Sequence, residues 1–290
     1  MKKLVLFILL ITFIFTSCSP SQDGGFKSER ESFSQSGEVV ESEENESLEE
    51  SLNESKTEDG VDVDSLTDMQ KLLKVIEKVE TSQSFYSISS GETKSCGIRQ
   101  NISAKRYRIG KTLFKESVSY SFLVKTAIQT LVSGGKYLVR ESEKISSLTE
   151  IRWSQTATDV GKTEYLARYG SVCIGLNNYI LNGQTVTYLQ AQKTDCGYVF
   201  TVIADPNTST VNMVKEMKTN ADSSDYPTFS SVKITIETDF ELLVISARYQ
   251  CAYEVSLLGG VKCEEDMTEK FYGFNQTDTY PEEDFFTKYC

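Results

Sequence analysis

Apolar residues recur at helical spacing near residue 66, and the period changes to two further along the chain. A helix to about Val79 is predicted because apolar side chains recur at intervals of three or four residues, which places them on one helix face. Ser65 is predicted to cap its N-terminus. Its polar side carries as many acids as bases, which favours packing on its own domain over binding to a membrane. The apolar positions are Leu66, Met69, Leu72, Leu73, Ile76 and Val79.

Alternating apolar and polar residues from about Tyr86 onward predict half-buried strands. Ser133-Gly134-Gly135 is predicted to join two of them, and Asn182-Gly183 predicts a hairpin between residues 174–181 and 185–189. A further strand follows, with Tyr198, Phe200, Val202 and Ala204 on one face. Asp205-Pro206 should end that strand and begin a second helix, with aspartate as the cap and proline in the first turn.

The last third of the chain has the most regular alternation. A strand around Val232, Ile234 and Ile236 precedes a longer one whose polar face carries Ser246, Arg248, Gln250 and Glu254. The opposite face is predicted to hold Leu243, Ile245, Ala247, Tyr249, Cys251, Tyr253 and Val255. A strand with one buried face and one solvent-exposed face indicates an antiparallel sheet. About ten strands, a leading helix and one mid-chain helix predict an α+β domain with a large, curved, half-barrel-like antiparallel sheet and both helices on one face.

The N-terminus has the composition of a bacterial export signal that ends in a lipobox. Lys2-Lys3 precede an apolar run from Leu4 to Phe15, and Thr16-Ser17 precede Cys18. The run is shorter than the roughly 20 residues of a transmembrane helix. We therefore predict a signal peptide at 1–17, lipidation of Cys18, and a location on the outer face of the membrane in the bacterial cell envelope.

Charge and composition divide the remaining chain into a tether and a domain. Residues 19–66 contain 15 acidic and three basic residues, whereas the chain from residue 67 contains 27 acidic and 25 basic residues. The acidic segment buries too little apolar surface to order itself, so 18–64 is predicted to be a disordered tether and 65–290 a single domain. The chain has no basic stripe, which disfavours nucleic acid as a partner.

Histidine is absent from the sequence. Ser-His-Asp and Cys-His catalysis and the usual zinc sites are therefore excluded. The clusters of acidic residues read most simply as solvated turns, and no phosphate-binding loop is complete. We predict no catalytic residue, no metal site and no cofactor, and we rank an enzyme below a binding protein and an interaction module.

Six cysteines remain once Cys18 is set aside. An even number in an exported domain favours disulfides, although buried free thiols are the alternative. The most local pairing joins Cys251 to Cys263 across a hairpin that would set the two thiols opposite each other. The other predicted pairs are Cys173 with Cys196 and Cys96 with Cys290.

The order of these elements resembles the half-barrel lipoprotein superfamily, which includes the lipoprotein carriers of the bacterial envelope and mycobacterial lipid-binding lipoproteins. The resemblance covers Ser65 to about Phe286. It is strongest where the strand at 198–206 leads through the second helix into 226–229 and 232–239. It implies that acyl chains are held between a curved sheet and its helices.

Two functions are consistent with this sequence. The first is binding of a lipid or other apolar ligand in a half-barrel cavity, without chemical change. The second is a tethered structural or interaction module that docks another envelope protein and has a filled core. For the first, the lining is predicted to include Phe200, Val202, Ile234, Ile236, Ile245, Tyr249 and Tyr253.

Overall fold

The computed structural model describes residues 62–122, 125–172, 176, 178–221, 226–255 and 260–275. Within these residues the chain forms an antiparallel sheet of twelve strands and three α-helices. The fold is therefore α+β and half-barrel-like, as predicted, with two more strands and one more helix than the alternation indicated. The sheet and the α-helices belong to one compact unit that begins at Leu66 in the described part of the chain.

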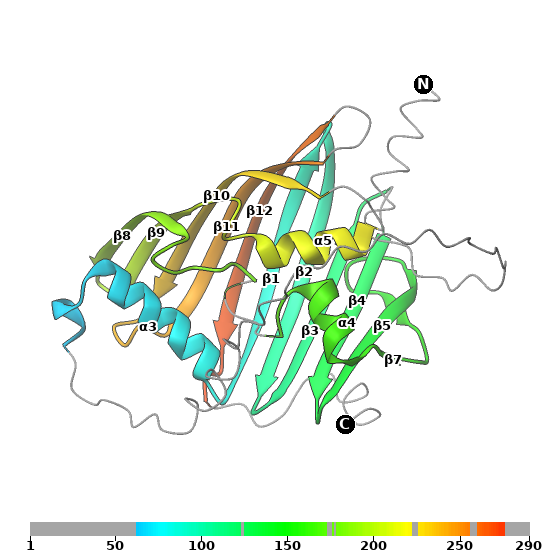
Figure 1. The fold of residues 1–290 in the computed structure, drawn as a ribbon, viewed down its shortest axis with the longest axis horizontal. Helices are drawn as coiled ribbons and strands as arrows, with labels where there is room; N and C mark the ends of the chain where they lie inside the picture. Colours follow the sequence, from blue (N-terminus) through cyan, green and yellow to red (C-terminus); the bar gives the residue numbers. More distant parts are fainter. Residues whose placement is uncertain are drawn as a thin grey trace, which may run out of the picture. The chain divides into compact units, whose positions relative to one another are not determined.

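The sheet consists of two meanders that meet in its middle. Its strand order is β6-β5-β4-β3-β2-β1-β12-β11-β10-β9-β8, and β7 pairs with β5. The first strand thus lies beside the last one (Figure 1). The strands are β1 (Ser84–Ser95), β2 (Ile98–Ile109), β3 (Thr112–Tyr120), β4 (Lys125–Ser133), β5 (Lys136–Ile145), β6 (Ile151–Trp153), β7 (Thr158–Asp159), β8 (Val186–Thr194), β9 (Gly197–Ala204), β10 (Thr228–Thr238), β11 (Val244–Val255) and β12 (Val261–Tyr272).

The three helices α3 (Asp68–Thr81), α4 (Gly161–Tyr169) and α5 (Val211–Ala221) lie on the same side of the sheet (Figure 1). Helix α3 contacts β8, and α4 contacts β5 and α5. Hydrophobic burial holds α3 in place, because its Leu72, Val75 and Val79 are at most 1% exposed. The carboxylate of Asp68 accepts the Ala191 backbone N–H of β8 at 2.9 Å, which satisfies one donor of the edge strand.

Helix α3 begins two residues later than the predicted Ser65 cap. Ser65 lies in the short 3-10 helix η2 (Val63–Ser65), and Thr67 is the N-cap. The Thr67 side chain accepts the Gln70 N–H, and the Gln70 side chain accepts the Thr67 N–H at 2.9 Å. This reciprocal pair is a capping box, which satisfies two helix-end donors where Ser65 would satisfy one.

The middle of the chain contains the largest departures from the predicted elements. Asn182-Gly183 forms a turn, but β8 starts after it and pairs with β9, so the predicted hairpin is wrong. The Asn182 side chain instead accepts the N–H groups of the two residues that follow Gly183. Helix α4 was not predicted, and Val160 at its N-cap makes no side-chain bond. Helix α5 begins at Val211 rather than Pro206, because the Asp205 carboxylate accepts the N–H groups of Asn207 and Thr208 and closes a turn.

Strand β11 keeps the predicted face except at its start. A register irregularity pairs Glu237 with Ser246 but Thr238 with Val244, so one extra residue stands between the pairs. A bulge of this kind moves the following side chain to the other face. Val244 is therefore buried, while Ile245 is 47% exposed. The prediction that Ile245 shares the buried face is wrong.

Apolar clusters also cover the sheet face opposite the helices. Lys115 of β3 bonds to Glu216 of α5, so its neighbour Phe114 points away from the helices. Phe114 packs there with Tyr107, Leu131 and Leu138. The half of the sheet that contains β2–β5 therefore has buried side chains on both faces.

Candidate functional site

A cleft of 480 Å³ lies between the C-terminal part of α3 and residues 176–182. This volume falls within the roughly 300–1,000 Å³ of small-molecule sites. Leu73 is 42% exposed although it is a leucine on an otherwise well-packed helix. The apolar residues that line the cleft are Leu73 and Ile76 of α3, and Leu176, Tyr179, Ile180 and Leu181 of the facing segment.

The rim of the cleft is polar and partly acidic. Glu77 and Glu80 of α3 contribute carboxylates, and Asn182 and Asn212 contribute amides. No basic residue is found among the described residues that line the cleft. Within the described part of the chain, the cleft is therefore lined by six apolar or aromatic residues and seven polar ones, which is more polar than most ligand sites.

Residues 178–182 have no regular secondary structure, and tertiary contacts hold them in place. The Tyr179 ring stacks on Tyr249 of β11 with centroids 5.5 Å apart and planes 9° apart. The Ile180 N–H donates to the Ser209 carbonyl at 2.9 Å, and the Thr185 hydroxyl donates to the Ile180 carbonyl at 2.7 Å. The segment is therefore a preformed wall of the cleft.

Of the predicted lining residues, Tyr249 lies directly against this wall. Six of the seven are at most 8% exposed: Phe200, Val202, Ile234, Ile236, Tyr249 and Tyr253. They face the helices, and neither of the two cavities described in this section includes them in its lining. Tyr249 supports the cleft indirectly through its stack with Tyr179. Direct contact of these six residues with a ligand stays a prediction.

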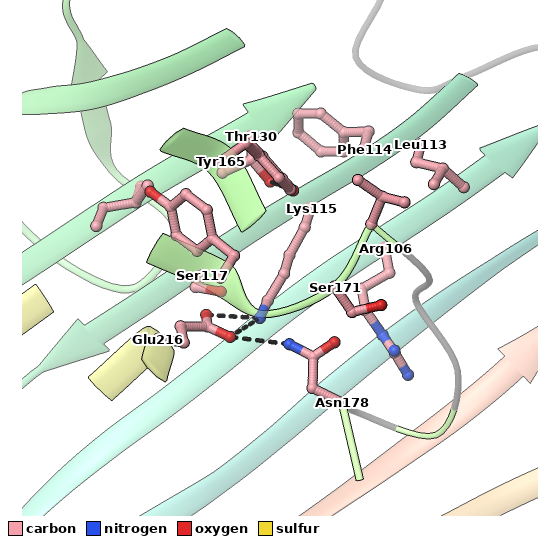
Figure 2. A pocket seen from close by; sticks show the side chains of 13 residues that line it. Arg106, Leu113, Phe114, Lys115, Ser117, Thr130, Tyr165, Ser171, Asn178 and Glu216 are labelled. Carbon is pink, nitrogen blue, oxygen red and sulfur yellow. Dashed lines mark hydrogen bonds and ion pairs between the residues drawn. The ribbon is translucent and has the colours of Figure 1, made fainter. Parts of the chain in front are cut away.

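A second, small cavity of 40 Å³ lies between β3, α5 and residue 178 (Figure 2). The Lys115 ammonium donates to both oxygens of Glu216 at 2.6 and 2.8 Å, and the Asn178 amide donates to Glu216 at 2.9 Å. Charge-assisted bonds of this kind are short and strong. The space that remains is enough for a few water molecules and too small for a lipid.

A buried ion pair crosses the centre of the sheet and was not predicted. The Arg106 Nε of β2 donates to Glu269 of β12 at 2.8 Å, and the Tyr249 hydroxyl donates to the other Glu269 oxygen at 2.8 Å. Strand β1 lies between β2 and β12, and its Ser87 and Ser89 are opposite the charged residues. Small side chains there let the guanidinium reach across β1. Acidic residues in the apolar column of β12 are the signal in the sequence that could have indicated the pair.

The described cysteines are free thiols. Cys96 and Cys196 are exposed, and Cys251 and Cys263 are buried. The predicted Cys251–Cys263 disulfide is absent because β11 pairs Cys251 with Glu265 and Tyr253 with Cys263, so the two thiols are diagonal rather than opposite. Burial raises the pKa of the Cys251 thiol, which disfavours the reactive thiolate. Cys173 and Cys290, the predicted partners of Cys196 and Cys96, lie outside the described residues.

The signal peptide, Cys18 and the tether up to residue 61 also lie outside the described residues. Of the helices in the described part, none combines the length and apolar composition that a membrane span requires. No group of three or more histidine, cysteine, aspartate or glutamate residues with metal-binding geometry occurs in that part.

No protein-family model and no curated protein matches this chain. Solved structures similar to it include a LolA superfamily protein from Nitrosomonas europaea, at 10% identity over 75% of this chain and 97% of that one, with a TM-score of 0.28. A DUF1329 family protein from Desulfovibrio piger has 10% identity over 75% and 95% of the two chains, with a TM-score of 0.29.

A protein domain from Vibrio parahaemolyticus, named for outer membrane lipoprotein sorting, has 9% identity over 74% and 95% of the two chains, with a TM-score of 0.29. Two of these names belong to the superfamily that the sequence resembles. All three TM-scores are below 0.5, so these similarities support no conclusion about function. The α+β fold class is assigned from the protein's own open sheet with helices on one side.

Proposed function

We propose that this chain is a bacterial envelope lipoprotein, anchored through lipid on Cys18, that binds a lipid or other apolar ligand without changing it chemically. The ligand occupies the cleft between α3 and residues 176–182. The protein is a carrier or receptor rather than an enzyme. Its tether of residues 18–64 gives the binding domain reach above the membrane surface.

One observation carries this proposal: a cleft of 480 Å³ with six apolar or aromatic side chains in its lining stands open beside α3. Protein interiors contain few voids larger than a water molecule. The exposure of Leu73 is unfavourable in free energy, because its apolar surface remains in contact with water. A bound acyl chain would remove that surface from water at about 25 cal/mol per Å².

The experiment is photocrosslinking of the full-length protein in its native membrane with a diazirine-bearing palmitic acid. Peptide mass spectrometry should place the crosslinks on α3 and on residues 176–182. Leu73→Trp fills the cleft and should reduce crosslinking there at least fivefold. Ile88→Trp is the matched control, because Ile88 is also exposed, at 45%, but lies on β1 outside the cleft lining.

Two results would contradict the proposal. Crosslinks spread evenly over the surface would mean that the cleft has no preference for the acyl chain, and equal labelling of both variants would mean that the cleft is not the binding site. The same spectra report the acyl groups on Cys18, and an unmodified thiol there would remove the anchor from the proposal.

A further inference from the structure

Glu265 of β12 is a carboxylate on the helix-facing side of the sheet that forms no hydrogen bond and no ion pair with any described residue. Its column on β12 is otherwise apolar or paired. Val261, Cys263, Met267 and Phe271 are buried there, and Glu269 is bonded to Arg106 and Tyr249. An unpaired carboxylate in such a column costs stability, so its presence calls for a functional reason.

The sheet around Glu265 is less completely covered than the centre of the sheet. Toward one end of β1, the helix-facing Ser87 and Ser89 are at most 3% exposed. Toward the other end, the helix-facing residues become half-exposed. They are Gly91 and Thr93 of β1, Gln100 and Ile102 of β2, and Glu265 itself, which pairs with Thr93. The carboxylate therefore stands where the cover over the sheet ends.

A second polar group lies near it, because Tyr179 stacks on Tyr249, which is next to Cys251 on the same face of β11, and Cys251 pairs with Glu265. Tyr179 is 7% exposed, and its buried hydroxyl has the Cys251 thiol beside it but no oxygen or nitrogen partner among the described residues. Burial raises the pKa of Tyr179, and the neighbouring Cys251 thiol and Glu265 carboxyl contribute to the rise. A thiol is a weak hydrogen-bond partner, so the tyrosine hydroxyl still lacks a strong one.

The charges around Glu265 favour a cation. Lys115 is bonded to both oxygens of Glu216, so these two residues neutralise each other and an ionised Glu265 leaves one net negative charge. Burial, with a smaller contribution from Glu216, raises the pKa of Glu265 to about 7, and Lys115 opposes the rise. The titratable groups that face this site are Tyr179, Lys115, Glu216, Cys251, Tyr253 and Cys263.

We propose that Glu265 and Tyr179 form a recognition site for a primary amine, in which the Glu265 carboxylate pairs with the ammonium group and the Tyr179 hydroxyl accepts one of its hydrogen bonds. The half-exposed Ile102 and the buried Met267 provide apolar contact for the carbon attached to the amine. Tyr179 also lines the proposed lipid cleft, so the two sites share this residue, whereas Glu265 lies outside the cleft lining.

The test titrates full-length protein in phosphatidylcholine nanodiscs with butylammonium, n-butanol and butyrate, followed by saturation-transfer NMR. Butylammonium should bind at least tenfold more tightly than n-butanol at pH 8. Its affinity should rise about tenfold from pH 6 to pH 8, because the ionised fraction of a group with a pKa near 7 rises from about 0.1 to about 0.9 while an alkylamine stays protonated.

Variants separate the site from general attraction to an acidic protein. Glu265→Gln should abolish both the preference for butylammonium and its pH dependence, and Tyr179→Phe should weaken binding about threefold to tenfold. Glu264→Gln is the matched control, because Glu264 is the exposed neighbour on the opposite face of β12. It should bind as the unaltered protein does.

The proposal is overturned if Glu265→Gln binds butylammonium as tightly as the unaltered protein, or if n-butanol or butyrate binds as well as the amine. A further arm identifies the source of the amine. Competition by nanodiscs that contain phosphatidylethanolamine supports a lipid headgroup at the site, whereas butylammonium binding without that competition supports a soluble amine.

Discussion

The two halves of the sheet present opposite chemistry to the helices. Beneath α3, the inward positions of β9 and β10 are fully buried and apolar, with Phe200, Val202, Ile234 and Ile236 at 0% exposure. In the other half, the inward positions of β2, β3 and β12 carry Arg106, Lys115, Glu265 and Glu269. One half therefore gains its stability from hydrophobic burial, and the other must satisfy its charges with partners.

This difference indicates a division of labour within one continuous sheet. The inward apolar side chains of the apolar half need no hydrogen-bond partner. They form the rigid base on which Tyr249 supports the cleft wall. The polar half contains paired charges in its covered part and the unpaired Glu265 where the cover ends. We expect a functional role where a polar side chain lacks a hydrogen-bond or ion-pair partner, and a stabilising role where it has one.

The largest expected effect is a loss of stability caused by a substitution in the apolar half. Ile234→Ala should lower the free energy of unfolding by about 4 kcal/mol, because it removes a fully buried side chain and leaves a cavity. Ile245→Ala is the matched control from the same sheet, because that isoleucine is 47% exposed, and it should cost less than about 1 kcal/mol. Urea denaturation followed by circular dichroism measures both. Equal losses would mean that burial of Ile234 is not what stabilises this half.

The sequence predicted the apolar half better than the polar half, for a physical reason. Alternation over Val232, Ile234 and Ile236 is a local pattern, and burial follows from it directly. The Arg106–Glu269 pair joins residues 163 positions apart, so no local pattern reveals it. The bulge that turns Ile245 outward also depends on pairing with β10, which the β11 sequence alone does not show.

The candidate site was less predictable than the fold. One wall of the cleft is formed by Leu176 and residues 178–182, which have no regular structure and therefore no periodicity to detect. Leu73 did appear in the helical pattern, but its exposure depends on what faces α3. Helix α4 was missed because Val160 provides no capping side chain, although Tyr165 and Tyr169 are spaced for one buried helix face.

A slightly smaller effect is expected from the paired charges of the polar half. Glu269→Gln should lower the free energy of unfolding by about 3 kcal/mol, because it leaves the Arg106 guanidinium buried without a counter-charge. The double variant Arg106→Leu with Glu269→Leu should recover most of this loss, since neither charge remains buried. Urea denaturation again provides the measurement.

The exposed pair on the same ladder is the control for this charge effect. Arg248 donates to Asp266 at 2.8 and 2.6 Å, and both side chains are at least 40% exposed. Asp266→Asn should therefore cost less than about 1 kcal/mol. A loss as large as that of Glu269→Gln would mean that burial is not the cause.

An effect of the opposite sign is expected from the unpaired carboxyl. The pKa of Glu265 is raised from 4.5 to about 7, so the folded state retains a proton that the unfolded state releases between these values. Stability therefore falls as pH rises from 4.5 to 7, and the loss is constant above pH 7. Glu265→Gln removes this loss and should stabilise the protein by up to about 3 kcal/mol at pH 8.

Below pH 4 the carboxyl is protonated in both states, so the Gln variant and the unaltered protein should unfold at nearly equal urea concentrations. Glu264→Gln, on the exposed face, should show no such pH-dependent gain. A Glu265→Gln variant less stable than the unaltered protein at pH 8 would mean that the carboxylate has a partner in solution. It would then belong with Glu269 among the paired charges and not at an open recognition site.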